Sequence, residues 1–310
     1  MTGPFRPVGA ATLWDAIPRK TPHYAEKRSD HPDRARFDMP HLTSTSTVLA
    51  VVTHYRYERW LAQSLRSLLD QTRRPDAIVV VDDASVPPPT EIVQAFPEVT
   101  LMRAEANGGP YRLLQAIFAQ AAFDAFMLQD ADDWSHPERL ALMLAAAERS
   151  RADMVGCQMT DVYEGLSPQA PIVVPEDPLA AALQEPTRHV LTMGTSLIAK
   201  ALVERSGGLS AGLRFGADSE FTRRALFAGT VVNIPDACYF RRIHAESATQ
   251  SKETGYGSPL RRSIQLRVQE RARHNVAQFL AGQPSDLTPL DPGESARLIH
   301  LAGPRLRGFP

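Results

Sequence analysis

The sequence predicts an α/β protein built on one mostly parallel sheet with helices on both faces. Three observations support this fold class. First, β-branched apolar runs alternate with segments whose leucines recur at helical spacing between residues 46 and 140. Second, the alternation repeats as strand, helix, strand, helix, strand, helix, strand, which is typical of parallel strands joined by crossover helices. Third, polar residues follow the end of every predicted strand.

The first two strands and the helix between them are the clearest elements. Residues 46–55, STVLAVVTHY, are rich in valine and predict a buried strand. Residues 56–72, RYERWLAQSLRSLLDQT, place their leucines on one helical face. Residues 75–85, PDAIVVVDDAS, predict a second buried strand that ends in two aspartates.

The next elements repeat this unit. Residues 87–96, PPPTEIVQAF, predict a short helix, and residues 99–110, VTLMRAEANGGP, a strand that runs into a glycine turn. Residues 111–122, YRLLQAIFAQAA, predict a helix, and residues 123–133, FDAFMLQDADD, a fourth strand. The rest of the chain, to about residue 256, is expected to complete the same domain. A C-terminal helix and a Pro-rich tail should follow over residues 257–310.

The bulk composition limits the classes of function. The 310 residues carry a formal net charge of −1, without the basic excess of a nucleic-acid-binding protein. Cys157 and Cys238 are too few for a disulfide framework and fit a reducing compartment. No apolar run approaches the roughly 18–20 residues of a membrane-spanning helix, and the N-terminus lacks the apolar core of a signal peptide. We therefore expect a cytoplasmic protein whose residues 1–45 form a partly ordered extension.

Polar side chains gather where the predicted strands end. They are Thr53 and His54, Asp82 and Asp83, Asn107 to Gly109, and Asp130 to Asp133. Ligands of parallel sheets bind in the crevice beyond the carboxyl ends of the strands. Helix capping accounts for any one of these groups, but it explains the joint pattern poorly. The sequence therefore predicts a binding site along this edge.

The densest group places Asp130, Asp132 and Asp133 within four positions. Like charges this close repel one another, so the carboxylates either cap the following helix or hold a positively charged group. Ser135, just before Pro137, is itself a suitable start signal for that helix. A cap at Ser135 makes the aspartates redundant as caps and favours a bound cation.

Seven motifs in a fixed order extend the pattern over residues 46–250. They are VVTHYRYERWLAQSLRSLLDQT, IVVVDDAS, ANGGPY, LQDADDWSHPERL, MGTSLIAKALVERSGGL, RFGADSEFTRRAL and RRIHAESAT. Together they resemble the family 2 glycosyltransferases with the GT-A fold. The resemblance implies an inverting hexosyltransferase that uses a nucleoside diphosphate sugar, UDP-linked, as its donor.

The resemblance also implies a donor site at the carboxyl edge. Thr53 and Asp83 are implied to contact the nucleotide base, where a carboxylate accepts a hydrogen bond from a ring N–H. Asp82 either fixes the turn or touches the ribose, and Asp130 is implied to face the ribose or the donor sugar. The other implied donor-binding positions are Tyr55, Asn107, Gly109 and Ala131.

A divalent cation, Mn²⁺ or Mg²⁺, is implied beside the donor. Such ions take oxygen ligands, usually from one or two carboxylates and from the phosphates. Asp132 is the implied direct ligand, and Asp133 supports or ligates. His244 is implied to reach the metal or diphosphate from a C-terminal loop, although a purely structural histidine stays an alternative.

Asp218, in FGADSEF, corresponds to the catalytic base of the family. An ordinary acidic first turn, favoured by the helix dipole, is the alternative interpretation. Ala217 stands where the family carries Glu, so Glu220 stays open as a substitute base. Glu220, Trp134 and Arg242 are assigned to the acceptor side or to the support of the site.

A second departure from the family follows the glycine turn, where Leu114 and Gln115 occupy the family's Arg and Asn positions. These substitutions put some donor contacts in doubt and point to an unusual donor sugar. The expected acceptor is a glycan, a lipid-linked molecule or a small molecule, and no nucleic acid is expected. The predicted amphipathic C-terminal helix permits peripheral contact with the inner membrane face, and a homo-oligomer is left open.

Two alternatives to an active glycosyltransferase stay open. One is a non-catalytic nucleotide-sugar-binding module on the same fold, because a fold does not fix function. The other is a metal-dependent nucleotidyltransferase or phosphotransferase. The first strand is not followed by a Lys-rich or Gly-rich phosphate loop, which disfavours this second class.

Overall fold

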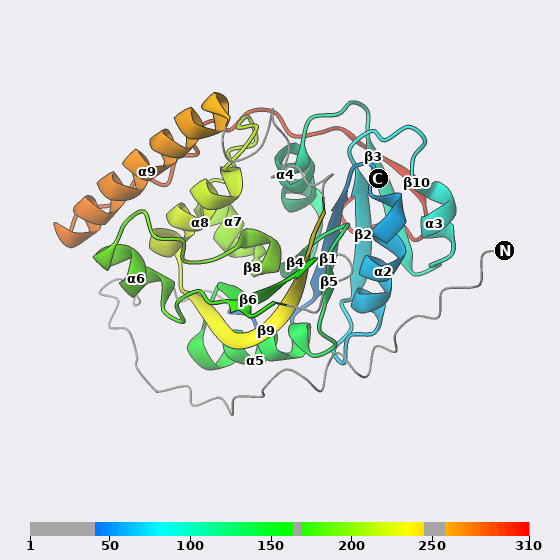
Figure 1. Ribbon diagram of the computed structural model, residues 1–310, viewed down its shortest axis with the longest axis horizontal. Coiled ribbons are helices and arrows are strands. Elements are labelled where there is room, and N and C mark those ends of the chain that lie inside the picture. The colour runs from blue at the N-terminus through cyan, green and yellow to red at the C-terminus, as the bar shows by residue number, and fades with distance from the viewer. Residues whose placement is uncertain (1–40, 164–168, 245–257, 310) are drawn as a thin grey trace.

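The computed structural model describes residues 41–163, 169–244 and 258–309. Within these residues the chain forms one sheet of ten strands. Helices lie against both faces of that sheet (Figure 1). The N-terminal extension expected over residues 1–45 therefore falls almost wholly outside the described residues.

The first half follows the alternation that the sequence predicted. Its elements are β1 (Val48–His54), α2 (Glu58–Leu69), β2 (Ala77–Asp82), α3 (Thr90–Gln94), β3 (Val99–Ala104), α4 (Pro110–Gln120) and β4 (Ala125–Asp130). β1 pairs in parallel with β2 and with β4, and β2 pairs in parallel with β3. The chain thus winds outward from β1 to β3 and then crosses back to β4. This reversal opens a crevice at the carboxyl ends of β1 and β4, which is where ligands of such sheets bind.

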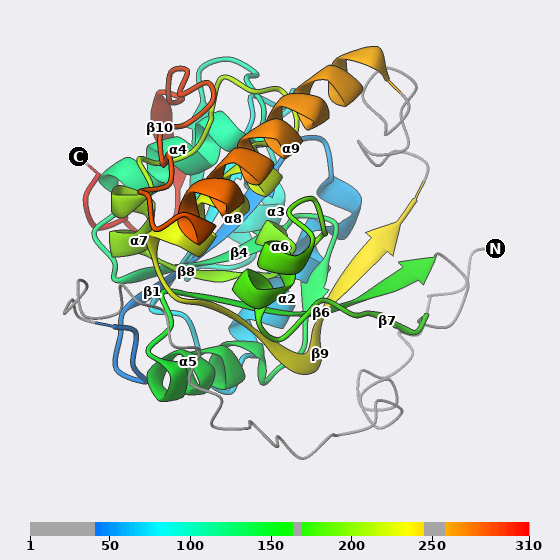
Figure 2. The ribbon, with the colours of Figure 1, turned by 90° about the vertical axis from the view of Figure 1, so that its left-hand side faces the viewer.

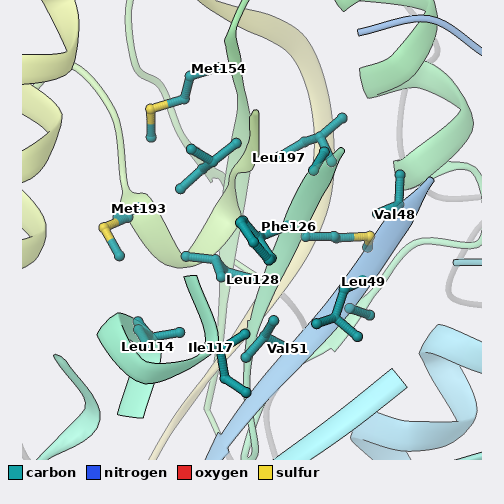
Figure 3. Packing of buried hydrophobic residues seen from close by; sticks show 14 of the residues in the cluster. Val48, Leu49, Val51, Leu114, Ile117, Phe126, Leu128, Met154, Met193 and Leu197 are labelled. Carbon is teal, nitrogen blue, oxygen red and sulfur yellow. The ribbon is translucent and has the colours of Figure 1, made fainter. Parts of the chain in front are cut away.

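Apolar side chains from both layers hold these strands in place. α2 and α3 cover one face of the parallel strands and α4 covers the other (Figure 1). Leu114 and Ile117 of α4 pack toward Phe126 of β4 (Figure 3). Three leucines of α2 are fully buried at the predicted spacing: Leu61, Leu65 and Leu68. The strands are buried on both faces, which explains why they read as continuous apolar runs.

The second half extends the sheet with strands of mixed direction. Its elements are β5 (Trp134–Ser135), α5 (Arg139–Ser150), β6 (Met154–Tyr163), β7 (Pro171–Ile172), α6 (Pro178–Gln184), η2 (Met193–Thr195), β8 (Leu197–Ala199), α7 (Lys200–Arg205), α8 (Ala217–Ala228) and β9 (Val231–Ile243). β8 is antiparallel to β4 and β6, whereas β6 and β9 run parallel, side by side (Figure 2). β5 pairs antiparallel with β9. Since β5 closely follows β4, this pairing brings β9 back to the end of β4.

The C-terminal part contains one predicted element and one that the sequence did not predict. The predicted helix is α9 (Pro259–Leu280), which lies across the outside of α8 (Figure 2). Its apolar stripe includes Ile264 and Val268, which pack with Leu213 and Ala217. The tail then forms β10 (Leu298–Ala302), an antiparallel strand beside β3. The sheet order is therefore β10-β3-β2-β1-β4-β8-β6-β9-β5, with β7 paired to β6.

The predicted fold class is confirmed, because helices flank a large sheet whose first four strands are parallel. In the described part of the chain, no helix has both the length and the apolar composition required to span a membrane.

Candidate functional site

Asp82, the first of the two aspartates after β2, is fully buried and tied into the protein. His54 Nδ1 lies 2.8 Å from its Oδ1 atom, and the N–H of Ser85 donates to its Oδ2 atom at 2.9 Å. The guanidinium of Arg103 lies 3.5 Å from the same carboxylate. The geometry thus fits the first of the two roles left open for Asp82, fixing the turn, and leaves no surface for the ribose.

Asp83 holds the glycine loop between β3 and α4. Its carboxylate accepts hydrogen bonds from Asn107 Nδ2 at 2.9 Å and from the N–H groups of Gly108 and Gly109 at 2.9 and 2.8 Å. Burial raises the pKa of Asp83, and the two glycine N–H groups partly offset that rise. Gly109 has a φ of 88°, which a side chain would strain. A nucleotide base would therefore have to share this carboxylate with the loop.

Thr53 and Asp130 lie side by side at the carboxyl ends of the paired strands β1 and β4. The two residues are paired in register, and the Thr53 hydroxyl lies close enough to the Asp130 carboxylate to lower its pKa. Ala131 follows and is fully buried. Tyr55 lies exposed beyond β1, with the Arg56 guanidinium 5.0 Å from its ring centroid. Thr53 and Asp130 therefore lie at the carboxyl edge of the sheet, and Tyr55 follows β1 on the surface.

Asp132 lies against His244, which directly follows β9 and is 112 positions later in the chain. Nε2 of His244 is 2.9 Å from Oδ2 of Asp132. The histidine ring packs 4.1 Å from the ring of Trp60 and 5.5 Å from that of Tyr57. Aromatic side chains at the start of α2 thus fix the imidazole that β9 delivers to the end of β4.

Asp133 and Arg242 brace the segment after β4. The backbone N–H of Arg242 donates to Asp133 Oδ1 at 2.8 Å, and Arg242 Nε donates to the carbonyl of Asp132 at 3.0 Å. The Arg242 guanidinium lies near two indoles, 5.8 Å from the ring centroid of Trp60 and 4.9 Å from that of Trp134. Arg242 and Trp134 therefore hold the segment that carries Asp132 and Asp133 in place.

The aspartates at the end of β4 perturb one another. Desolvation by the surrounding protein, together with repulsion from Asp132 and then Asp218, raises the pKa of Asp130 to about 7, although its side chain keeps access to solvent. Burial, followed by the charges of Asp132 and Asp130, raises the pKa of Asp133 well above its usual value. The partners of these carboxylates, the N–H of Arg242 at Asp133 and the charge of Arg241 near Asp130, offset only part of this rise in pKa.

Asp218 joins this cluster from the first turn of α8. The hydroxyl of Tyr111, on α4, donates to Asp218 Oδ1 at 3.1 Å. Asp218 lies close enough to Asp130 for its charge to raise the pKa of Asp130. Residues more than eighty positions apart therefore come together at one end of the sheet.

Glu220, the substitute base that the sequence left open, points elsewhere. Both of its oxygens bond to Arg224, at 2.6 and 2.7 Å, and Ser210 Oγ donates to Oε2 at 2.8 Å. The ion pair is almost completely buried. A carboxylate neutralised in this way is poorly placed to take a proton from an acceptor, so the geometry favours Asp218 over Glu220 for that role.

The expected cap at Ser135 is wrong. The first turn of α5 has Glu138 as its N-cap residue, without a side-chain cap bond. Ser135 instead lies buried in β5, where its hydroxyl donates to Gln129 and accepts from Arg139. The sequence did not reveal that this serine belongs to a polar network beneath the sheet.

Three further residues of the site were not predicted. The Tyr239 hydroxyl accepts the N–H of Asp130 at 3.0 Å and hydrogen-bonds to the carboxylate of Asp133. A Cβ atom at Gly194 would lie 3.3 Å from Asp130 Oδ2, so a side chain there would crowd the crevice. Tyr111, which holds Asp218, is the third. Gly194 lies in the MGTS motif and could have been identified from the sequence. Tyr239 reaches the site only because β9 pairs with its neighbouring strands, which the sequence does not reveal.

The second departure from the family pattern has a structural counterpart. Leu114 is buried in the core, and Gln115 accepts the N–H of Leu209 at 2.8 Å. The glutamine therefore links α4 to the segment before α8.

The described residues offer a partial set of ligands for a divalent cation. In the described residues, no three His, Cys, Asp or Glu side chains form a group that could hold a metal ion. Asp132 and His244 form a pair, and the buried Nδ1 of His244 has no hydrogen-bond partner within that part of the chain. Carboxylate oxygen and imidazole both suit Mn²⁺, and added positive charge would offset the mutual repulsion of Asp130 and Asp133. Asp132 and His244 would therefore fit a divalent cation only if its remaining ligands came from a bound molecule.

Comparison with known families gives a match over about half of the chain. Residues 49–206 match the family model described as glycosyl transferase family 2. A galactofuranosyltransferase, GlfT1 of Mycolicibacterium smegmatis, is 26% identical over 65% of this chain and 63% of its own length. An uncharacterized glycosyltransferase of Nostoc sp. is 28% identical over 38% of each chain. The chain thus spans between about two fifths and two thirds of these relatives.

Solved structures share the fold. Residues 1–349 of the S. aureus protein TarS, in complex with UDP-GlcNAc, superpose with a TM-score of 0.57 at 20% identity, over 75% of this chain and 73% of that 1–349 chain. Against a longer TarS chain the match covers 43% of its length. TarS in complex with UDP gives a TM-score of 0.54 at 19% identity, over 76% and 72% of the two chains.

Proposed function

The chain belongs to glycosyl transferase family 2, and we propose that it transfers a sugar from a UDP-linked donor to an acceptor hydroxyl with inversion of the anomeric carbon. The observation that carries this proposal is the convergence of Asp218 with the carboxylates at the end of β4. A non-catalytic binding module does not require a solvent-accessible carboxylate from the second half of the chain at this place. A reaction that removes a proton from the acceptor requires such a carboxylate as its base.

The donor would lie along the carboxyl ends of β1, β2 and β4. Its uracil would lie near Asp83 and Thr53, and its sugar near Asp130 and Gly194, where the absence of a side chain leaves room. The UDP complexes of TarS support the choice of UDP among the nucleotides.

A divalent cation would be held by Asp132 and His244. When bound, it would supply positive charge to the diphosphate and thereby favour its departure. The aromatic packing of His244 against Trp60 and Tyr57 would keep the imidazole in position for this role.

Asp218 would act as the general base. The acceptor oxygen would lose its proton to Asp218 and form a bond to the anomeric carbon, while the bond from that carbon to the diphosphate oxygen breaks. UDP then leaves with the electron pair. The hydrogen bond from Tyr111 would hold the carboxylate in position for the proton transfer.

The test is UDP release from a panel of UDP-sugars, with Mn²⁺ and with EDTA. A slow metal-dependent release of UDP without added acceptor is expected, because water can substitute for the acceptor. Pyrophosphate among the products would instead identify a nucleotidyltransferase. Tight UDP-sugar binding without any turnover, across acceptors and metals, would identify a non-catalytic binding module.

A further inference from the structure

We propose that Arg139 is a positioning residue for the donor sugar, because its buried guanidinium holds Gly194 against the end of β4 and so sets the gap between Gly194 and Asp130. This inference rests on the proposed function, which places the donor sugar beside Gly194 and Asp130, and it names a further residue on which that position depends. Arg139 is the first residue of α5 and acts through the groups that it holds.

The guanidinium of Arg139 is a positive charge that lies wholly inside the protein. The side chain is fully buried, and no carboxylate in the described part of the chain forms an ion pair with it. Arg224 is also fully buried, but it is paired with Glu220. Burying a charge without an opposite charge is unfavourable, and an apolar side chain would pack in such a place more favourably. The function of Arg139 is therefore to be found in the polar groups that it contacts.

Arg139 joins two segments at the point where their backbone pairing ends. The antiparallel pairing of β4 with β8 ends in a hydrogen bond from the N–H of Leu128 to the carbonyl of Ser196. Beyond this bond, Nη2 of Arg139 donates to the carbonyl of Leu128 at 2.9 Å and, at a longer 3.4 Å, to the carbonyl of Gly194. The guanidinium thus continues the connection between β4 and η2 past the last backbone bond.

A second set of contacts connects Arg139 to Asp130. The guanidinium lies 5.0 Å from the centroid of the Tyr239 ring, and the Tyr239 hydroxyl accepts the N–H of Asp130 at 3.0 Å. Nη1 of Arg139 donates to the hydroxyl of Ser135 at 2.9 Å, which fixes the planar group from its other nitrogen. Arg139 therefore contacts Gly194 directly and reaches Asp130 through Tyr239.

The gap between Gly194 and Asp130 is narrow enough for its width to matter. A Cβ atom on Gly194 would lie 3.3 Å from Asp130 Oδ2 and 3.9 Å from the Tyr239 hydroxyl. A small displacement of Gly194 would therefore change the room for a sugar ring. The uracil would lie near Asp83, which is bound to the glycine loop and not to Arg139. Loss of Arg139 should thus affect the donor sugar and leave the binding of UDP unchanged.

The experiment replaces Arg139 by lysine, which keeps the charge but cannot bond two carbonyls and a hydroxyl through one planar group. Arg224→Lys is the matched control, because it changes a buried arginine that is bound to Glu220 on α8. Calorimetry with Mn²⁺ gives the affinities for UDP, UDP-glucose, UDP-galactose and UDP-GlcNAc. Hydrogen exchange without ligand follows the backbone amides of Thr195 and Ser196, which lie directly after Gly194.

Arg139→Lys should bind UDP as tightly as wild type does, but should lose about tenfold in affinity for the UDP-sugar that wild type binds best. Release of UDP from that donor should slow by a similar factor. Exchange at Thr195 and Ser196 should become faster, because η2 is held less firmly. Arg224→Lys should lower the melting temperature, with normal affinities for UDP and UDP-sugar and normal exchange at these two amides.

Gly194→Ala changes the same gap without altering Arg139. The added methyl group narrows the gap, so the affinity for the UDP-sugar should again fall while the affinity for UDP is kept. In the double variant Arg139→Lys/Gly194→Ala the two losses should not add, because both substitutions act on one gap.

The positioning role would be overturned by equal losses for UDP and UDP-sugar in Arg139→Lys, or by normal exchange at Thr195 and Ser196. It would also be overturned by losses that add in full in the double variant. Equal losses for UDP and UDP-sugar in Gly194→Ala would show that the gap does not hold the sugar. A wild-type protein that binds neither UDP nor a UDP-sugar would overturn the proposed function, and the exchange rates would still decide whether Arg139 holds η2.

Discussion

The ends of β2 and β4 each present aspartates to the same edge of the sheet, but the protein treats them differently. Asp82 and Asp83 are saturated by internal donors, namely His54, Ser85 and the loop from Asn107 to Gly109. The group at the end of β4 keeps fewer internal partners: Asp132 contacts the imidazole of His244, Asp133 accepts the N–H of Arg242, and mutual repulsion raises the pKa of Asp130 and of Asp133. Charge that the fold itself does not neutralise is available to a ligand. The aspartates at the end of β2 therefore chiefly stabilise the fold, whereas those at the end of β4 are the candidates for contact with a ligand.

The largest effect is expected for Asp132→Ala. Transfer should become undetectable, because the diphosphate loses the ligand that would hold its cation, while the thermal stability should change little. Activity assays with Mn²⁺ and melting curves measure both quantities. The matched variant at β2, Asp82→Ala, should behave in the opposite way and lose about 1–3 kcal/mol of stability, since it leaves buried donors unpaired. Near-normal turnover of Asp132→Ala, or activity that survives EDTA, would contradict the comparison.

Two carboxylates of α8 provide the second test. Asp218→Asn keeps the size of the side chain but removes the base, so kcat should fall about 10²- to 10⁴-fold with nearly unchanged UDP affinity. Glu220→Gln breaks a buried ion pair and should cost about 3–5 kcal/mol of stability instead. Steady-state kinetics and chemical denaturation separate the two outcomes. If folded Asp218→Asn transfers sugar at the normal rate, Asp218 is not the base.

Asp83→Ala tests whether the end of β2 is purely architectural. If Asp83 also contacts the base, UDP and UMP should both bind about tenfold more weakly, because the lost contact does not involve the phosphates. Calorimetry with both nucleotides gives the ratio directly. Unchanged affinities together with lower stability would confine Asp83 to holding the glycine loop.

The smallest effect is expected for the stability of Asp130→Asn. A carboxyl group whose folded-state pKa of about 7 exceeds its unfolded value of about 3.9 favours folding at low pH and loses that contribution as the pH rises toward 7. Removing the charge should therefore raise the melting temperature of the ligand-free protein at pH 8 and leave it nearly unchanged at pH 4. Solvent access to Asp130 limits the gain to a few degrees. A melting temperature that is lower at pH 8 than that of wild type would show that the repulsion is already compensated.

The fold was largely predictable from the sequence, because each strand and helix of the first half is encoded locally. Buried parallel strands must be apolar on both faces, and the leucines of α2 must share one side of a helix. The cap at Ser135 was mispredicted because the position of this serine depends on a contact between residues far apart in the sequence. A serine before a helix satisfies the local rule, but the pairing of β5 with β9 draws Ser135 into the buried network of Gln129 and Arg139.

The sequence by itself determined the alternation of elements, the aspartates at the strand ends and the helical position of Asp218. Those features depend on residue type and on neighbours within a few positions. The tertiary structure decided which carboxylates are neutralised inside the protein and which face the crevice. Asp218 and Glu220 have the same charge and share the first turn of α8, yet one lies beside Tyr111 and Asp130 and the other beside Arg224. The difference arises because electrostatic compensation depends on distance in space, which packing sets and sequence separation does not.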